Sequence, residues 1–145
     1  MSSVDRRTGL EVLDRDTCLE LLATAEVGRL AIGGLGDVVL LPINYALDGE
    51  TVVFRTDPGT KLERAGRWGR ATFEIDDFDL VARAGWSVVV TGRLEEVTHY
   101  DATAFERVGR LPIDPWVGGE KRHWLRLVPT RITGRRLVPV AEAGP

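Results

Sequence analysis

The segment VGRLAIGGLGDVVLLPINYALDGETVVFRT, residues 27–56, decides the fold class of this chain. It contains three runs rich in β-branched and other apolar residues, and the segments between them, GGLG and DGE, have the composition of turns. The segment therefore predicts three consecutive strands, joined by hairpins, over residues 27–32, 37–47 and 51–56.

Both faces of the second run are largely apolar. Alternation along a strand places Val39, Leu41, Ile43, Tyr45 and Leu47 on one face and Val38, Leu40, Pro42 and Asn44 on the other. A strand covered on both sides lies deep in a barrel or at an interface, but Pro42 has no N–H group to donate to a ladder. We therefore expect Pro42 at an edge or a bulge, where a ligand or a partner chain covers the strand.

Further strands follow the first three. RATFEID, residues 70–76, alternates apolar and polar side chains, and WSVVVTGRLEEV, residues 86–97, predicts a longer strand in which Gly92 marks a bend or a bulge. KRHWLRLV and RITGRRLVP, within residues 121–139, supply one or two final strands. About six strands are expected in total.

Helices are predicted between and around these strands, over residues 13–28, 57–68 and 101–111. Asp14 or Asp16 is the N-cap of the first helix, Asp57 followed by Pro58 starts the second, and Asp101 caps the third. Hairpin connections with few helices predict a mainly β fold, a six-stranded antiparallel β-barrel with peripheral helices. The whole chain, residues 1–145, is expected to form one domain.

Composition limits the classes of function. A chain of 145 residues with 43% hydrophobic and 28% charged residues is typical of a globular protein with a sizeable core, and its net charge of -3 argues against nucleic acid as the main partner. The lone Cys18 excludes an internal disulfide, and two histidines with one cysteine predict no metal site. The opening MSSVDRRTGLEVL lacks the apolar run of a secretory signal, so we expect a cytoplasmic protein without a membrane segment.

The junction FRTDPGTKLER, residues 54–64, places two cations close to a predicted helix start. Arg55 lies at the end of a strand and Lys61 in the first helical turn, where free backbone N–H groups attract anions. Asp57 adds a negative charge at the same place. The pattern therefore leaves two interpretations, an anion-binding site or a capped helix with solvated cations.

Three segments together, LPINYALDGETVVFRTDPGTKLER, ATFEID and GWSVVVTGRLEEV, resemble the pyridoxamine 5'-phosphate oxidase-like family of FMN-binding split β-barrel proteins, in its actinobacterial type. The resemblance covers roughly residues 14–137 and implies a split barrel, with residues 1–13 as an N-terminal extension and 139–145 as a tail. It also implies a homodimer that holds FMN, or alternatively the deazaflavin F420, in grooves between its subunits.

The resemblance carries roles for particular residues. It implies that Arg55, Thr56 and Lys61 hold the cofactor phosphate, which suits the bidentate geometry of arginine. Pro42, Ile43 and Asn44 correspond to the strand that borders the isoalloxazine ring, and Trp86 and Ser87 to the position of a polar contact from the partner subunit. Ser87 is shorter than the amide common in the family, so its contact requires a water, and plain core packing is the alternative for Trp86.

The implied function is an FMN-dependent oxidoreductase with a small-molecule substrate and no assigned catalytic residue. The C-terminal GEKRHWLRLVPTRITGRRL does not reproduce the family's arginine and histidine motif for the vitamin phosphate, so oxidation of pyridoxamine phosphate is not expected. Arg122, His123 and Arg126 either line the groove or are solvated, and Trp116 is a lid or a loop anchor. The alternatives are an F420-dependent reductase and a non-catalytic module that binds flavin or haem.

Overall fold

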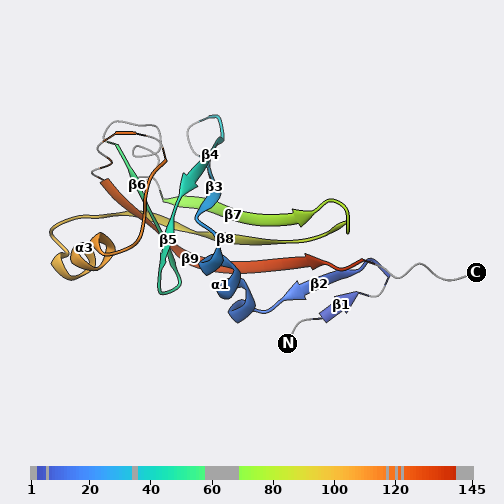
Figure 1. The fold of residues 1–145 in the computed structure, drawn as a ribbon. Helices are drawn as coiled ribbons and strands as arrows, with labels where there is room; N and C mark the ends of the chain where they lie inside the picture. The colour runs from blue at the N-terminus through green and yellow to red at the C-terminus, as the bar shows by residue number, and fades with distance from the viewer. Residues whose placement is uncertain are drawn as a thin grey trace, which may run out of the picture.

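A computed structural model describes residues 3–5, 7–33, 36–57, 69–116, 118–119, 121 and 123–139 (Figure 1). Its strands are β1 (Ser3–Asp5), β2 (Leu10–Leu13), β3 (Val27–Ile32), β4 (Val39–Asn44), β5 (Ala46–Asp48), β6 (Thr51–Thr56), β7 (Arg70–Asp79), β8 (Ala84–Val97) and β9 (His123–Leu137). Its helices are α1 (Arg15–Thr24) and α3 (Ala102–Gly109). The predicted helix over 57–68, including Lys61, and residue Arg122 lie outside the described residues.

All strands form one antiparallel sheet, in the order β1-β2-β9-β8-β7-β3-β4, with β6 on β9 and β5 on β6. The prediction of a mainly β, antiparallel fold with peripheral helices is confirmed. The six expected strands are present, residues 37–47 divide into β4 and β5 around Tyr45, and the N-terminal extension adds β1 and β2. The described strands do not close into a complete barrel, because no ladder joins β4 to β6.

Strand β9 is the central element of this sheet. It pairs with β8 along one side, and on the other side with β6 over its first half and with β2 over its last residues. A register shift after Thr91 places Gly92 opposite Pro129, which confirms the predicted irregularity at Gly92. The irregularity lies between two parts of β9, one paired with β6 and the other with β2 (Figure 1).

The main core lies on one face of the sheet. Alternate residues of β7, such as Phe73 and Ile75, pack there against Val88 and Val90 of β8 and against Leu22 of α1. Helix α1 begins at the predicted N-cap Asp14, whose carboxylate accepts a hydrogen bond from the backbone N of Thr17 at 2.8 Å.

Helix α1 ends at Thr24, four residues before the predicted end. Gly28 belongs instead to β3, where a Cβ atom would lie 2.1 Å from the Phe73 ring, so the glycine makes room for this ring. The second helix, α3, has the predicted cap Asp101 and covers a smaller apolar cluster that contains Val53 and Val97. Neither described helix is long and apolar enough to cross a membrane.

Candidate functional site

The predicted phosphate site begins at the end of β6. Alternation along β6 directs Phe54 and Thr56 into the core, and Thr56 is 3% exposed. Arg55 faces the other way and lies opposite Trp124 of β9, with its guanidinium carbon 4.8 Å from the centroid of the Trp124 ring. Its Nε donates to the backbone oxygen of Lys121 at 2.9 Å. The Arg55 side chain is therefore held between β9 and the loop before it.

Asp57, which follows directly after β6, is paired with Lys121. The Asp57 carboxylate accepts hydrogen bonds from the backbone N of Lys121 and from its Nζ, the latter at 3.0 Å. These hydrogen bonds from Lys121 lower the pKa of Asp57. The negative charge that argued against an anion is thus offset by a cation that the sequence did not assign to this place.

The strand that the resemblance assigns to the cofactor ring, β4, lies at the edge of the sheet. β4 is last in the strand order, which confirms the edge position expected from Pro42. Pro42 is exposed, whereas Ile43 faces the core and packs against it. The Oδ1 atom of Asn44 accepts a hydrogen bond from the backbone N of Trp116 at 3.0 Å. Asn44 and Trp116 also line a small cavity of about 110 Å³.

The segment between α3 and β9 contacts both the end of β4 and the end of β6. Trp116 donates its backbone N–H to Asn44 at the end of β4. Lys121 contacts Arg55 in β6 and Asp57 directly after it. In Figure 1 this segment lies beside the upper end of β6. Trp116 as a whole is 73% exposed, so its contact with Asn44 is made by its backbone and most of the residue is open to other contacts.

Trp86 and Ser87 are far from this end of the molecule. Ser87 pairs with Arg135 on β9, and Arg55 pairs with Trp124, eleven residues earlier on the same strand. At about 3.3 Å per residue, this separation is about 36 Å along β9. Trp86 packs against the core and Ser87 points to the opposite face. Within one chain, Ser87 and Arg55 are therefore placed near opposite ends of β9.

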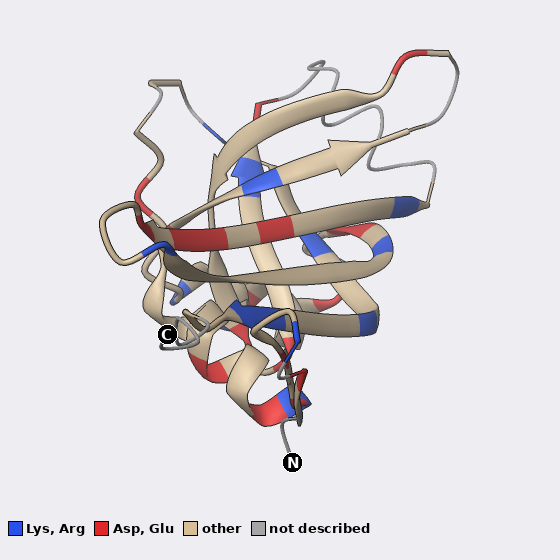
Figure 2. Ribbon diagram, turned by 90° about the vertical axis from the view of Figure 1, so that its right-hand side faces the viewer, with Lys and Arg blue, Asp and Glu red and all other residues tan. Residues whose placement is uncertain are grey.

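The outer face of the sheet, opposite the core, carries mixed chemistry. Ladder pairing places Pro42, Arg29, Glu74, Val89 and Thr133 in one row across β4, β3, β7, β8 and β9. Arg29 of β3 is the ladder partner of Glu74 of β7, and Figure 2 shows blue and red bands on neighbouring strands of the sheet. Next to this row, the apolar side chains of Val38 and Leu40 are 69% and 64% exposed. This face combines exposed apolar area with a compact ion cluster.

Glu74 is the member of this cluster with a buried oxygen that lacks a hydrogen-bond partner among the described residues. This oxygen is Oε1, and the other, Oε2, lies 3.9 Å from Arg29. Burial, together with the neighbouring Asp76, raises the pKa of Glu74 to about 7. Because the folded chain then binds a proton that the unfolded chain releases above its ordinary pKa of 4.5, stability should fall as pH rises from 4.5 to 7.

We expect Glu74→Gln to remove this dependence. The side chain is 29% exposed, so solvent screening reduces the effect to about 1 to 2 kcal/mol of added stability near pH 8, with little change near pH 5. Urea unfolding at both pH values and fixed protein concentration measures it, with Glu20→Gln on the exposed side of α1 as control. Equal pH dependence in the Glu74→Gln variant and the parent would contradict the assignment.

The sequence of this chain matches the model of a known protein family. A family model described as pyridoxamine 5'-phosphate oxidase matches residues 14–136, most of the chain. The chain belongs to this family. The predicted resemblance is thereby confirmed, and the sheet with its edge strand β4 is the family's split barrel.

Several proteins of known sequence or structure are similar to most of the chain. An uncharacterized Mycobacterium tuberculosis protein, Rv0080, is 34% identical over 131 residues, which are 87% of this chain and 84% of that protein. A solved structure titled as the FAD binding protein from Mycobacterium smegmatis is 35% identical with a TM-score of 0.76, covering 87% of this chain and 97% of that one. The protein DIP1874 from Corynebacterium diphtheriae is 29% identical with a TM-score of 0.73, covering 90% and 99%.

Sequence reasoning did not predict that Lys121 lies at the end of β6, in contact with Arg55 and Asp57. Its partner Asp57 is 64 residues earlier, and no local pattern connects the two. The glycine before it, Gly119, has a φ of 132°, and a Cβ atom there would lie 2.4 Å from Asp57 Oδ2. The two glycines of WVGGEK, residues 116–121, were the available indication in the sequence that a cation could come close to another segment here.

Proposed function

We propose that this chain binds a flavin nucleotide between two copies of itself and uses it as an oxidoreductase on a small-molecule substrate. The observation that carries the proposal is the contact between Arg55 and Lys121 at the end of β6. The chain belongs to the pyridoxamine 5'-phosphate oxidase family, and a similar protein from M. smegmatis is described as FAD binding. FMN and FAD share the phosphate nearest the ring, so both fit this proposal. A cytoplasmic location, as expected from the sequence, completes it.

The residues at the β6 end fit a phosphate group. Arg55 and Lys121 bring two positive charges to this strand end. Of the described carboxylates there, Asp57 is paired with Lys121, and Glu96 lies 2.7 Å from the ring nitrogen of His123, the residue opposite Thr56. Arginine engages phosphate oxygens through charge-assisted hydrogen bonds, whereas Thr56 faces the core on the other side of β6 and is assigned to the phosphate by the family resemblance alone. By the family resemblance, Lys61 adds a further cation.

The ring end of the cofactor is assigned to β4. An edge strand presents backbone N–H and C=O groups with no ladder partner, and these are suited to the polar edge of a flat heterocycle. The exposed Pro42, Leu40 and Val38 supply apolar surface for its faces. When bound, the flavin supplies the hydride or electron transfer, and this chain holds and orients it and excludes water. We assign no proton-transferring residue.

The second copy follows from the position of Ser87. The family resemblance gives Ser87 a contact to the cofactor, yet in one chain it lies about 36 Å along β9 from the residue opposite Arg55. A partner in which Ser87 reaches the groove of the first chain satisfies both requirements. The exposed apolar side chains of β4 and the outer face are the surface we assign to this homodimer.

Mixed dimers test whether two chains build each site. We expect an Arg55→Ala variant and a Ser87→Tyr variant each to bind flavin weakly. Mixing them after unfolding and refolding should restore about a quarter of the sites, because half of the dimers are mixed and each has one intact groove. Binding is measured by quenching of flavin fluorescence. No recovery in a mixture shown to contain mixed dimers would contradict the shared site.

Identification of the bound molecule tests the cofactor. Mass spectrometry of the ligand released from denatured protein distinguishes FMN, FAD, F420 and haem. A yellow protein that is bleached by a nicotinamide donor supports the oxidoreductase, whereas F420 or haem in the released fraction replaces the flavin in the proposal. A flavin that is bound but never reduced by any donor would leave a binding module and remove the enzyme.

A further inference from the structure

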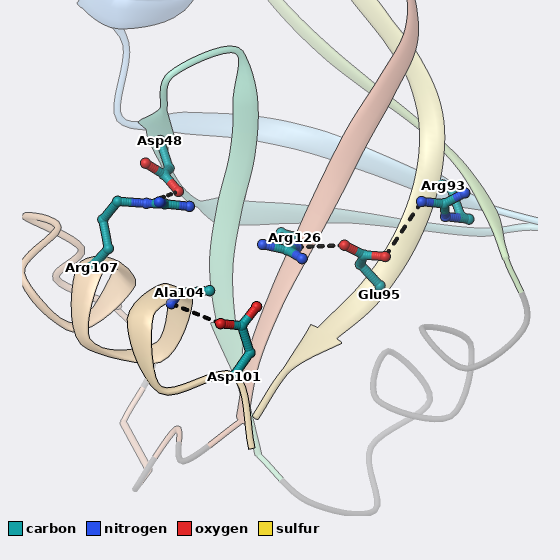
Figure 3. Close-up of polar contacts among 7 residues, drawn as sticks. All are labelled: Asp48, Arg93, Glu95, Asp101, Ala104, Arg107 and Arg126. Carbon is teal, nitrogen blue, oxygen red and sulfur yellow. Dashed lines mark hydrogen bonds and ion pairs between the residues drawn. The ribbon is translucent and has the colours of Figure 1, made fainter. Parts of the chain in front are cut away.

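A second charged site lies on the far side of β6 and β9 from the main core. There, a notch of about 520 Å³ opens between α3 and the strands β5, β6, β8 and β9. Its charged lining consists of Asp48, Arg93, Glu95, Arg107 and Arg126 (Figure 3). Its volume is in the range of small-molecule sites in proteins. Arg126 follows Trp124 by two residues on β9, so the notch is next to the β6 end but outside it.

Two carboxylates position the three guanidinium groups. Glu95 accepts from Nε of Arg126 at 2.5 Å and from Arg93 at 3.5 Å, and these residues come from β8 and β9. Asp48 at the end of β5 accepts from Nε of Arg107 at 2.8 Å. Figure 3 shows these contacts around the notch.

Helix α3 is itself held firmly beside the notch. The Asp101 cap accepts from the backbone N of Ala104 at 3.2 Å, and Ala104 and Val108 are buried against the strands below. These contacts fix the helix turn that carries Arg107, so this guanidinium is presented from a rigid element.

The terminal guanidinium nitrogens remain available for a ligand. Arg107 and Arg126 donate to their carboxylates through Nε, and within the described part of the chain their NH1 and NH2 groups have no protein partner. The Arg126 side chain is only 25% exposed, which limits competition from water. Three arginines against two carboxylates leave one positive charge in a chain whose net charge is -3.

We propose that this notch binds the phosphate or carboxylate group of a small metabolite, with the terminal nitrogens of Arg107 and Arg126 as donors. Two NH groups from each guanidinium match the paired oxygens of such an anion. The Nε contacts to Asp48 and Glu95 hold the two forks in place before the ligand arrives, so little side-chain entropy is lost on binding. This site is independent of the flavin.

Calorimetric titration with inorganic phosphate and, separately, with malonate tests the proposal. It is done at low ionic strength in an Arg55→Ala background, so that phosphate at the β6 end does not contribute. We expect saturable binding of one or both anions, weakened about tenfold by Arg107→Gln or Arg126→Gln. Binding of phosphate alone indicates a phosphate ester, and binding of malonate alone indicates a carboxylate metabolite.

Arg110→Gln is the matched control. Arg110 follows α3 and pairs with Glu106 at 2.9 Å on the exposed side of the helix, so its loss removes the same charge away from the notch. If neither anion binds, or if Arg110→Gln weakens binding as much as Arg107→Gln, the proposal is wrong. Where Arg126→Gln does not fold, Arg107→Lys retains the charge but not the fork and gives the same test.

Measuring flavin affinity and anion binding in the same variant distinguishes failure of the flavin proposal from failure of the anion-site proposal. Arg107→Gln in the otherwise unchanged chain should leave flavin affinity within about twofold. Loss of flavin binding together with anion binding would show that the notch belongs to the flavin site and would overturn its independence.

Discussion

Replacing both Arg55 and Lys61 by alanine is expected to weaken flavin binding by about 3 to 6 kcal/mol, because each change removes a charge-assisted contact worth about 1.5 to 3 kcal/mol. Arg55 lies at the end of β6, fixed over Trp124 and bonded to the Lys121 carbonyl. Its assignment to the phosphate follows from the proposed function, and that of Lys61 from the family resemblance. Fluorescence titration with FMN and with FAD measures the loss.

Two controls separate binding from folding in this experiment. Arg15→Ala with Arg110→Ala removes the same charge from exposed ion pairs with Glu50 and Glu106. These changes should leave flavin affinity nearly unchanged. Circular dichroism shows whether loss of Arg55 disturbs the loop that it holds. Unchanged affinity in a folded double variant at Arg55 and Lys61 would remove the phosphate site from the end of β6.

Gly92→Ala is expected to cost about 3 kcal/mol or more of the free energy of unfolding. A Cβ atom on Gly92 would lie 2.1 Å from the carbonyl oxygen of Val128 and 3.0 Å from the Cα of Pro129. Both neighbours are backbone atoms of β9, so relief requires the two longest strands to separate at their bulge. Urea unfolding measures the change.

The control for this variant is Gly109→Ala, at the end of α3. A Cβ atom there meets nothing within 4 Å, and alanine favours a helix over glycine, so stability should stay equal or rise slightly. A loss below about 1 kcal/mol in Gly92→Ala would mean that β9 shifts easily. The bend at Gly92 would then not be a fixed feature of the barrel.

Local chemistry in the sequence predicted most of the fold. Asp101 caps α3, Pro42 lies on an edge strand, and Gly92 lies at the register shift, because each of these features depends on the residue itself and its immediate neighbours. Runs of β-branched and apolar residues between turn sequences likewise predicted β3 and β6 with their observed bounds. The end of the first helix was placed too late, because Gly28 was interpreted as a helix stop when it makes room for Phe73.

Tertiary structure alone decided how the charged groups meet. Lys121 with Asp57 and Glu74 with Arg29 are paired through strand register and loop closure, over 64 and 45 residues of sequence. Spacing along the chain carries no information about such pairs, because they depend on which strands become neighbours. The same holds for the separation of Ser87 from Arg55, which is the distance along one strand between two different pairings.

By itself, then, the sequence determined the strands from β3 onward, the caps Asp14 and Asp101 and the family of this protein, because short-range sterics and hydrogen bonding depend on neighbouring residues. Only the folded sheet decided that Asp57 is neutralised, that Glu74 is buried beside Asp76, and that arginines from α3 and β9 share a notch. Charges act through space, and the sheet sets their distances.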